Sequence, residues 1–213
     1  FLTLLGRRIQ NVEEMREVIF RPYWNVPPSI LRKEILPLLR RDPDYLRQQN
    51  MEIVRGAGDD ALPVEATVEN IARLAQGSLR LRQRPGPQNA LGLVKFVFPN
   101  EENVYMHGTP ALQLFSRARR DFSHGCIRLE DPARFAEWVL RDQPEWTRQK
   151  IDAAMQGTKP VRVNLTHPLT VVLFYDTVHV NSEGVVSFVR DIYDDDRELD
   201  AALTRGYPYP VKF

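Results

Sequence analysis

Apolar residues recur at helical spacing in one part of the chain. The pattern covers residues 29–41, 45–54 and 67–75, and Ser29 is expected to cap the first of these helices. Polar turns separate the three segments, so residues 29–77 are predicted to be a helical block. Because the sequence on both sides of this block has the character of β-strands, the block is expected to be an insertion into a β framework.

The flanks carry short apolar or alternating segments, which is the pattern of β-strands. Leu91–Phe98 has the strongest such pattern, and Asn103–His107 is predicted to pair back on it across a tight turn. Further strands are predicted at 1–7, 17–20, 78–82, 160–165 and 169–180, with 185–189 forming a hairpin with the last of them. Helices are predicted at 131–140, capped by Asp131, and at 144–155. The chain is therefore expected to be an α+β protein.

Composition narrows the class of protein. The 213 residues are 43% hydrophobic and 27% charged, which is ordinary for a soluble globular protein. Lys and Arg number 29 against 28 Asp and Glu, and this net charge of +1 gives no reason to expect nucleic acid as a partner. No apolar run approaches the roughly 20 residues that span a bilayer. The chain begins at Phe1 rather than Met, so it is expected to be an excised piece, with any signal peptide or membrane anchor upstream of Phe1.

The segment from Tyr105 to Leu129 concentrates the reactive side chains. It holds Cys126, the single cysteine of the chain, and two of the four histidines, His107 and His124. A nearby imidazole that takes the thiol proton makes a cysteine an effective nucleophile. His107 is favoured as this base, because it lies at the end of a strand, on the face that Tyr105 shares, where it can be held rigidly.

Gly125 allows the backbone to turn sharply just before the cysteine. The amides of Gly125 and Cys126 are therefore expected to point at a developing oxyanion. Thiol, imidazole and oxyanion donors together predict acyl transfer through a thioester.

Other interpretations fit the same residues. A lone cysteine is often an inert buried side chain, and a lone histidine is often structural. His107, His124 and Cys126 could also bind zinc, although no Cys-x-x-Cys or His-Glu-x-x-His spacing accompanies them. Trp24 and Tyr105 are candidates for the lining of a cleft, with plain packing as the alternative.

The two ends of this segment resemble a family signature. His107-Gly108-Thr109-Pro110 is followed, 19 residues from histidine to cysteine, by Ser123-His124-Gly125-Cys126-Ile127-Arg128-Leu129. This arrangement resembles the L,D-transpeptidases of bacterial cell walls, which have a YkuD-type catalytic domain. Residues 22–28 and 82–96 resemble the large Gram-negative branch of that family. The resemblance implies a mixed β-sheet sandwich with peripheral helices, formed by 1–28 and 78–213, and a helical capping subdomain inserted at 29–77.

The resemblance also implies roles for the residues of the motif. Cys126 would be the nucleophile and His107 the base, with the carbonyl of Gly108 orienting the imidazole and the amides around Gly125 and Cys126 forming the oxyanion hole. The residues that it places beside the substrate are Ser123, His124 and Arg128. Many members of the wider family have asparagine at the position of Arg128, whose guanidinium could pair with a substrate carboxylate or brace the loop.

The reaction that the resemblance implies joins two peptidoglycan stem peptides. The thiolate attacks the L-centre carbonyl of the diamino acid in a donor tetrapeptide, releases the terminal D-alanine and leaves an acyl-enzyme. The side-chain amine of an acceptor stem then completes a 3→3 cross-link. No metal or other cofactor is implied, carbapenem β-lactams are expected to acylate the cysteine, and the expected location is the periplasm.

Two alternatives to cross-linking stay open. Water or the amine of a protein could accept the acyl group, which would make the protein a hydrolase or a protein-anchoring enzyme. The chain could also be a non-catalytic peptidoglycan-binding module.

Overall fold

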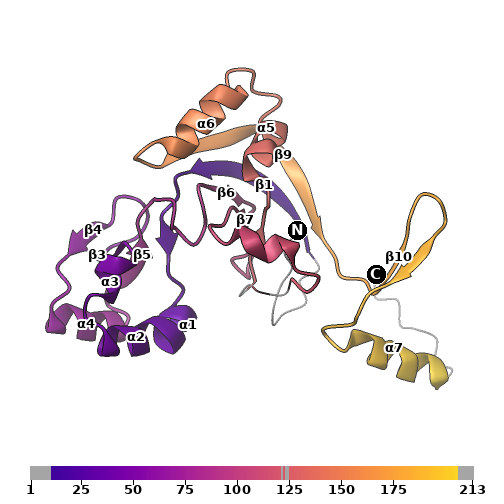
Figure 1. The fold of residues 1–213 in the computed structure, drawn as a ribbon, viewed down its shortest axis with the longest axis horizontal. Coiled ribbons are helices and arrows are strands. Elements are labelled where there is room, and N and C mark those ends of the chain that lie inside the picture. The colour runs from indigo at the N-terminus through magenta and orange to yellow at the C-terminus, as the bar shows by residue number, and fades with distance from the viewer. Residues whose placement is uncertain (1–10, 121, 123–124, 206–213) are drawn as a thin grey trace.

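A five-stranded sheet, here called the main sheet, forms the centre of the computed structural model, which describes residues 11–120, 122 and 125–205. Its strands lie in the spatial order β8-β7-β6-β1-β9 (Figure 1). Their bounds are Ile127–Arg128 (β8), Met106–His107 (β7), Val94–Val97 (β6), Asn11–Phe20 (β1) and Val161–Leu173 (β9). Neighbouring strands are antiparallel except β7 and β8, which are parallel.

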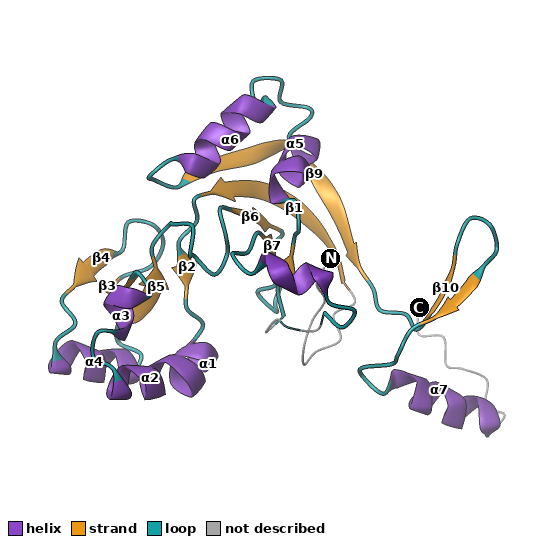
Figure 2. Cartoon of the chain, viewed as in Figure 1, coloured by secondary structure: helices purple, strands orange, loops and turns teal. Residues whose placement is uncertain are grey.

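One face of the main sheet is apolar and covered by helices. Val18 lies opposite both Phe96 and Val163 in the strand register, and all three side chains are buried. Helices α5 (Pro132–Val139) and α6 (Arg148–Gln156) supply the residues that pack on this face (Figures 1 and 2). Because side chains alternate along a strand, the intervening residues point to the opposite face.

The N-terminus of each of these two helices is set by a side chain that caps it. Asp131 caps α5 as predicted, because its Oδ1 accepts a hydrogen bond from the Arg134 amide at 3.0 Å. The second predicted helix begins at Arg148, four residues later than expected. Thr147 caps it through a 3.3 Å bond from the Lys150 amide to its hydroxyl.

A second unit, here called the cap, comprises residues 24–83. Its four-stranded sheet has the order β2-β5-β3-β4, with bounds Trp24–Asn25 (β2), Met51–Arg55 (β3), Leu62–Val64 (β4) and Arg80–Gln83 (β5). Its helical segments are α1 (Pro28–Ile30), the π-helical turn η1 (Leu31–Ile35), α2 (Leu36–Arg41), α3 (Tyr45–Gln48) and α4 (Val68–Ala75). The helices and the sheet enclose a separate hydrophobic cluster that extends from Val26 to Leu81. The cap therefore has a core of its own.

The prediction that residues 29–77 are all helical is wrong at β3 and β4. The helix predicted at 45–54 ends at Gln48, Asn50 takes a left-handed φ of 51°, and Met51–Val54 pairs with β5. Pairing with β5, about 30 residues away in sequence, buries Ile53 and Val54 in a strand and overrides the local helical pattern. The prediction that Ser29 caps the first helix is also wrong. That helix starts at Pro28, and Pro27 occupies the N-cap position without a side-chain hydrogen bond.

Most of the other predicted elements are present with shifted bounds. The helix at 67–75 is confirmed as α4, and the hairpin is confirmed as β10 (Val178–Val180) with β11 (Val186–Phe188). The strands predicted at 160–165 and 169–180 are partly wrong, because β9 runs unbroken from Val161 to Leu173. A five-residue 3₁₀ helix, η2 (Leu112–Ser116), and α7 (Asp195–Thr204) complete the elements.

The strand predicted at 1–7 lies outside the described residues. Within the described ranges, no helix is long and apolar enough to cross a membrane.

Two contacts set the position of the cap relative to the main sheet. Asn89 is buried, and its side-chain amide donates to the carbonyls of Pro22 at 3.2 Å and Arg84 at 3.0 Å, so it ties together the two chain crossings between the units. On the edge strand β9, Arg162 donates to Asp59 of the cap at 2.9 Å and to Glu17 of β1 at 2.9 Å. The cap is thus tied to the main sheet where the chain crosses between the units and by an ion pair with the edge strand β9.

The interior of the cap contains a buried ion pair. Arg82 is 3% exposed, and its Nε donates to Oε1 of Glu52 at 2.7 Å. The same guanidinium donates to the carbonyls of Gly58, Asp59 and Ala61 at 2.9–3.1 Å. Since these carbonyls belong to the loop that presents Asp59 to Arg162, the pair also shapes the edge of the cap that meets the main sheet.

Neutralising Glu52 should destabilise the protein strongly. A Glu52→Gln variant leaves the Arg82 charge buried without its counter-charge, and breaking such a pair costs about 3 kcal/mol or more. Chemical denaturation measures the loss of unfolding free energy. Glu14→Gln is the control, because Glu14 pairs with Arg16 at 2.7 Å on the exposed surface, where a pair is worth about 1 kcal/mol or less. Equal losses in the two variants would contradict this account of the pair.

Candidate active site

A single cross-strand row of the main sheet gathers three cationic or titratable side chains. The register aligns Ile19 of β1 with Lys95 of β6, Lys95 with His107 of β7, and His107 with Arg128 of β8. Directly paired residues project to the same face of a sheet. Lys95, His107 and Arg128 therefore share the face opposite the α5–α6 core.

Cys126 and Tyr105 join this row by alternation. Each precedes a row member by two residues, Tyr105 before His107 and Cys126 before Arg128. The residues between them, Met106 and Ile127, are paired with each other and buried in the core. The predicted common face of Tyr105 and His107 is confirmed, and their ring centroids lie 5.7 Å apart.

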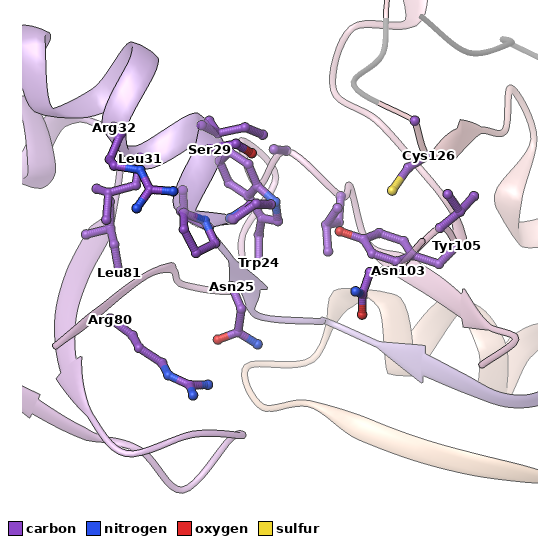
Figure 3. A pocket seen from close by; sticks show the side chains of 18 of the residues that line it. Trp24, Asn25, Ser29, Leu31, Arg32, Arg80, Leu81, Asn103, Tyr105 and Cys126 are labelled. Atoms are coloured by element: carbon purple, nitrogen blue, oxygen red, sulfur yellow. The ribbon is translucent and has the colours of Figure 1, made fainter. Parts of the chain in front are cut away.

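A cavity of about 810 Å³ lies between this face and the cap. The main-sheet side of its lining includes Lys95, Tyr105, His107, Cys126 and Arg128. The cap side includes Trp24, Arg32 and Arg80, and Figure 3 shows these three across the cavity from Cys126 and Tyr105. The volume is within the range of about 300–1,000 Å³ that is usual for ligand pockets.

The imidazole of His107 is held in one tautomer. His107 is 4% exposed, and its Nδ1 hydrogen-bonds the backbone carbonyl of Gly108. A carbonyl can only accept, so Nδ1 carries the proton and Nε2 keeps its lone pair. Burial lowers the pKa of His107 to about 4, opposed by the Gly108 carbonyl and reinforced by the charges of Arg128 and Lys95. At neutral pH His107 is therefore a neutral imidazole that can accept a proton at Nε2.

The thiol of Cys126 has opposing influences on its pKa. Burial raises the pKa, while hydrogen bonds from the backbone N–H and hydroxyl of Tyr105 and the positive charges of Lys95 and Arg128 lower it, with burial the larger effect. Burial and the neighbouring thiolate charge raise the pKa of Tyr105, which keeps its hydroxyl protonated. The resting pair is thus a neutral thiol and a neutral imidazole, so nucleophilic attack requires a proton transfer.

Gly92 supports the carbonyl that orients His107. Its φ is +64°, and a Cβ built on it would lie 2.6 Å from the Thr109 amide nitrogen and 2.7 Å from the Gly108 carbonyl carbon. No flexible side chain is available to move aside, since both contacts are with backbone. Only glycine fits this approach, and the close packing fixes the Gly108 peptide against His107.

The structure brings together most of the residues predicted for the site. Trp24 and Tyr105 both line the cavity, and Arg128 borders it with its Nε buried and lacking a hydrogen-bond partner among the described residues. Gly125 also lines the cavity and has a φ of +139°, and its part in an oxyanion hole stays a prediction.

Ser123 and His124 lie outside the described residues, so their predicted roles beside the substrate are not tested. The zinc hypothesis needs His124 and is not tested either. Within the described ranges, no three His, Cys, Asp or Glu side chains are grouped to hold a metal ion.

Sequence reasoning missed three cationic residues of the cavity: Lys95, Arg32 and Arg80. Lys95 had a detectable signal, because it is the single charged residue within the apolar run Leu91–Phe98 and alternation separates it from the core residues Val94 and Phe96. Arg32 and Arg80 had none, since exposed arginines are common and only the folded cap turns these two toward Cys126.

A side chain at position 92 should destabilise the protein. Gly92→Ala forces a Cβ against the Gly108 and Thr109 backbone, and we expect a loss of about 2 kcal/mol or more in unfolding free energy. Gly58→Ala is the matched control, because Gly58 also has a positive φ, of +77°, but open space around its Cα. If chemical denaturation gave the two variants the same loss, close packing at Gly92 would not be the cause.

Burial of His107 should make the protein less stable as the pH falls. Between pH 6.5 and about 4 the unfolded chain binds a proton that the folded protein excludes, so the free energy of unfolding decreases with decreasing pH. The decrease from this residue is about 2 kcal/mol at pH 5. The free energy of unfolding, measured by chemical denaturation, should therefore differ less between pH 7 and pH 5 in His107→Gln than in the wild type. Replacing the exposed His167 by Gln should leave the difference as in the wild type, and a His107→Gln variant that did the same would contradict the burial effect.

Comparison with known proteins gives a consistent assignment. Residues 12–163 match the YkuD family, described as the L,D-transpeptidase catalytic domain. The chain is also similar to a Haemophilus influenzae protein named "Putative L,D-transpeptidase", with 29% identity over 189 residues, which is 89% of this chain and 38% of that protein. The chain thus spans well under half the length of this relative. Since the family match covers more than two thirds of the chain and includes both His107 and Cys126, the chain belongs to the L,D-transpeptidase catalytic domain family.

Proposed function

We propose that this chain catalyses 3→3 cross-linking of peptidoglycan stem peptides through a thioester on Cys126. The observation that carries the proposal is that the thiol and a fixed, neutral imidazole line the same covered cavity. Family membership supports acyl transfer on peptidoglycan, and the geometry supports Cys126 and His107 as the pair that performs it.

The first half of the reaction forms the acyl-enzyme. The thiol proton passes to Nε2 of His107 while the sulfur attacks the L-centre carbonyl of the donor's diamino acid. The tetrahedral intermediate collapses, the bond to the terminal D-alanine breaks, and the imidazolium returns its proton to the leaving amine. The products are a thioester on Cys126, free D-alanine and a neutral His107.

The second half transfers the acyl group to an amine. The side-chain amine of an acceptor stem attacks the thioester, and His107 takes a proton from it. The sulfur leaves as a thiolate and recovers that proton, which restores the resting pair of thiol and imidazole. Throughout, the bond from Nδ1 to the Gly108 carbonyl fixes the tautomer, so Nε2 has a lone pair available to accept the proton.

The cap supplies a second wall for the substrates. Two exposed arginines, Arg32 and Arg80, line the cavity opposite the thiol and have no ion-pair partner among the described residues. Guanidinium groups suit the carboxylates that stem peptides carry. A covered cleft also limits the access of water, which favours an amine acceptor over hydrolysis.

The remaining parts of the proposal follow from the substrate. Carbapenem β-lactams, whose strained carbonyl can take the place of the donor carbonyl, should acylate Cys126. The enzyme would work in the periplasm, where stem peptides are exposed. Anchoring of a protein to the wall would use the same thioester with a different amine.

Mass spectrometry of wall fragments tests the proposal. Purified disaccharide-tetrapeptides incubated with the wild type should yield cross-linked dimers and free D-alanine, whereas Cys126→Ala should yield neither. The intact mass after mixing with a carbapenem should rise by one adduct in the wild type alone. Tripeptide monomers without dimers would establish the hydrolase alternative instead. A wild type that forms no adduct and no product would favour the non-catalytic module.

A further inference from the structure

Lys95 is placed beside the nucleophile by the main sheet. It is the neighbour of His107 in the cross-strand row, and Val94 and Phe96 on either side of it are fully buried in the core. Its Nζ lies 3.7 Å from the centroid of the Tyr105 ring. A cation over an aromatic face is attracted by the ring's quadrupole, so this contact fixes where the ammonium sits.

The ring that holds Lys95 also contacts the thiol. Tyr105 offers Cys126 both its backbone N–H and its hydroxyl as hydrogen-bond donors. Lys95 and Cys126 thus interact with the same tyrosine, and both line the cavity. The positive charge of Lys95 lowers the pKa of the Cys126 thiol, while the ammonium itself is engaged with the Tyr105 ring.

The other charges around Lys95 leave it without a counter-ion. Its charged neighbours are Glu17, Asp59 and Arg162, in addition to Cys126. Arg162 already pairs with both carboxylates, at 2.9 Å each. Among the residues that the structure describes, Lys95 forms no ion pair. Burying a cation without a counter-charge costs free energy, and Lys95 is half-buried. A negative charge on Cys126 would offset part of that free energy.

We propose that Lys95 is a positioning residue whose ammonium, held on the Tyr105 ring, stabilises the thiolate of Cys126 when His107 takes the thiol proton. The proposal rests on Cys126 being the nucleophile. No proton moves to or from Lys95, because His107 is the acceptor and Lys95 contributes charge alone. Arg128, the other cation facing the thiol from β8, shares this task, so loss of Lys95 weakens the effect without abolishing it. Arg32 and Arg80 approach from the cap and face the cavity rather than the Tyr105 ring.

The alternative is that Lys95 only packs against an aromatic ring. The chain offers a direct comparison, because Nζ of Lys150 lies 4.4 Å from the Trp146 ring centroid, at α6 on the other face of the main sheet. Both lysines make the same kind of contact, but only Lys95 shares its ring with a thiol. A purely structural role would give Lys95 and Lys150 equivalent effects.

The pH dependence of thiol alkylation separates these roles. Cys126 is the single cysteine, so the rate at which the proteolytic peptide that contains it gains one carbamidomethyl group on sulfur, measured by mass spectrometry after brief iodoacetamide pulses between pH 6 and 11, reports the ionisation of this thiol. In Lys95→Met the midpoint should rise by about one pH unit, which is about a tenfold slower reaction at neutral pH. Lys95→Arg should stay close to the wild type, and Lys150→Met should be indistinguishable from it.

Each outcome decides the proposal. An unchanged midpoint in folded Lys95→Met, or a rise that Lys95→Arg does not rescue, would overturn it. If Lys95→Met does not fold, Lys95→Gln is neutral yet polar and carries the same expectation. Because alkylation needs no peptidoglycan substrate, a shifted midpoint together with a wild type that forms no cross-links would reject the proposed function while keeping the role of Lys95.

Discussion

The site depends on the strand register of the main sheet. Side chains alternate faces, so the pairing that buries Val18, Phe96 and Val163 on one side necessarily presents Lys95, His107 and Arg128 on the other. A slip of one residue in β6 or β7 would bury a lysine or a histidine and expose Phe96 or Met106. The packing of the α5–α6 core and the alignment of Lys95, His107 and Arg128 therefore depend on the same strand register.

The cap complements this arrangement because it is an independent layer. It has its own hydrophobic cluster and a buried Arg82–Glu52 pair, while Asn89 and Arg162 tie it to the main sheet at separate places. The cavity therefore has one wall set by the register of the main sheet and another set by the packing of the cap. The thiol and imidazole belong to the first wall, and the unpaired arginines belong to the second.

The local sequence pattern predicted the strands of the candidate active site more accurately than it predicted the secondary structure of the cap. Alternation was sufficient to place Tyr105 and His107 on one face, because the strand is short and its partner β6 directly precedes it in sequence. The segment 45–54 is ambiguous by comparison, since its apolar residues fit a helix, and its strand is decided by β5, about 30 residues away. The role of Lys95 could not be predicted for a related reason: it follows from the pairing of Lys95 with His107 and from the ring of Tyr105, and neither the register nor the ring contact is visible in a linear pattern. Arg32 and Arg80 became relevant only once the cap was folded over the main sheet.

The protonation of Cys126 also bears on how the protein responds to oxidants. Peroxides react with thiolates far faster than with thiols, and a sulfenic acid is normally rescued by a second cysteine that forms a disulfide with it. This chain contains no second cysteine, so an oxidised Cys126 would have no resolving partner within it. Burial raises the pKa of this thiol and so lowers the fraction present as the oxidation-prone thiolate. The same burial that slows ionisation of the thiol thus also protects a cysteine for which the chain holds no replacement.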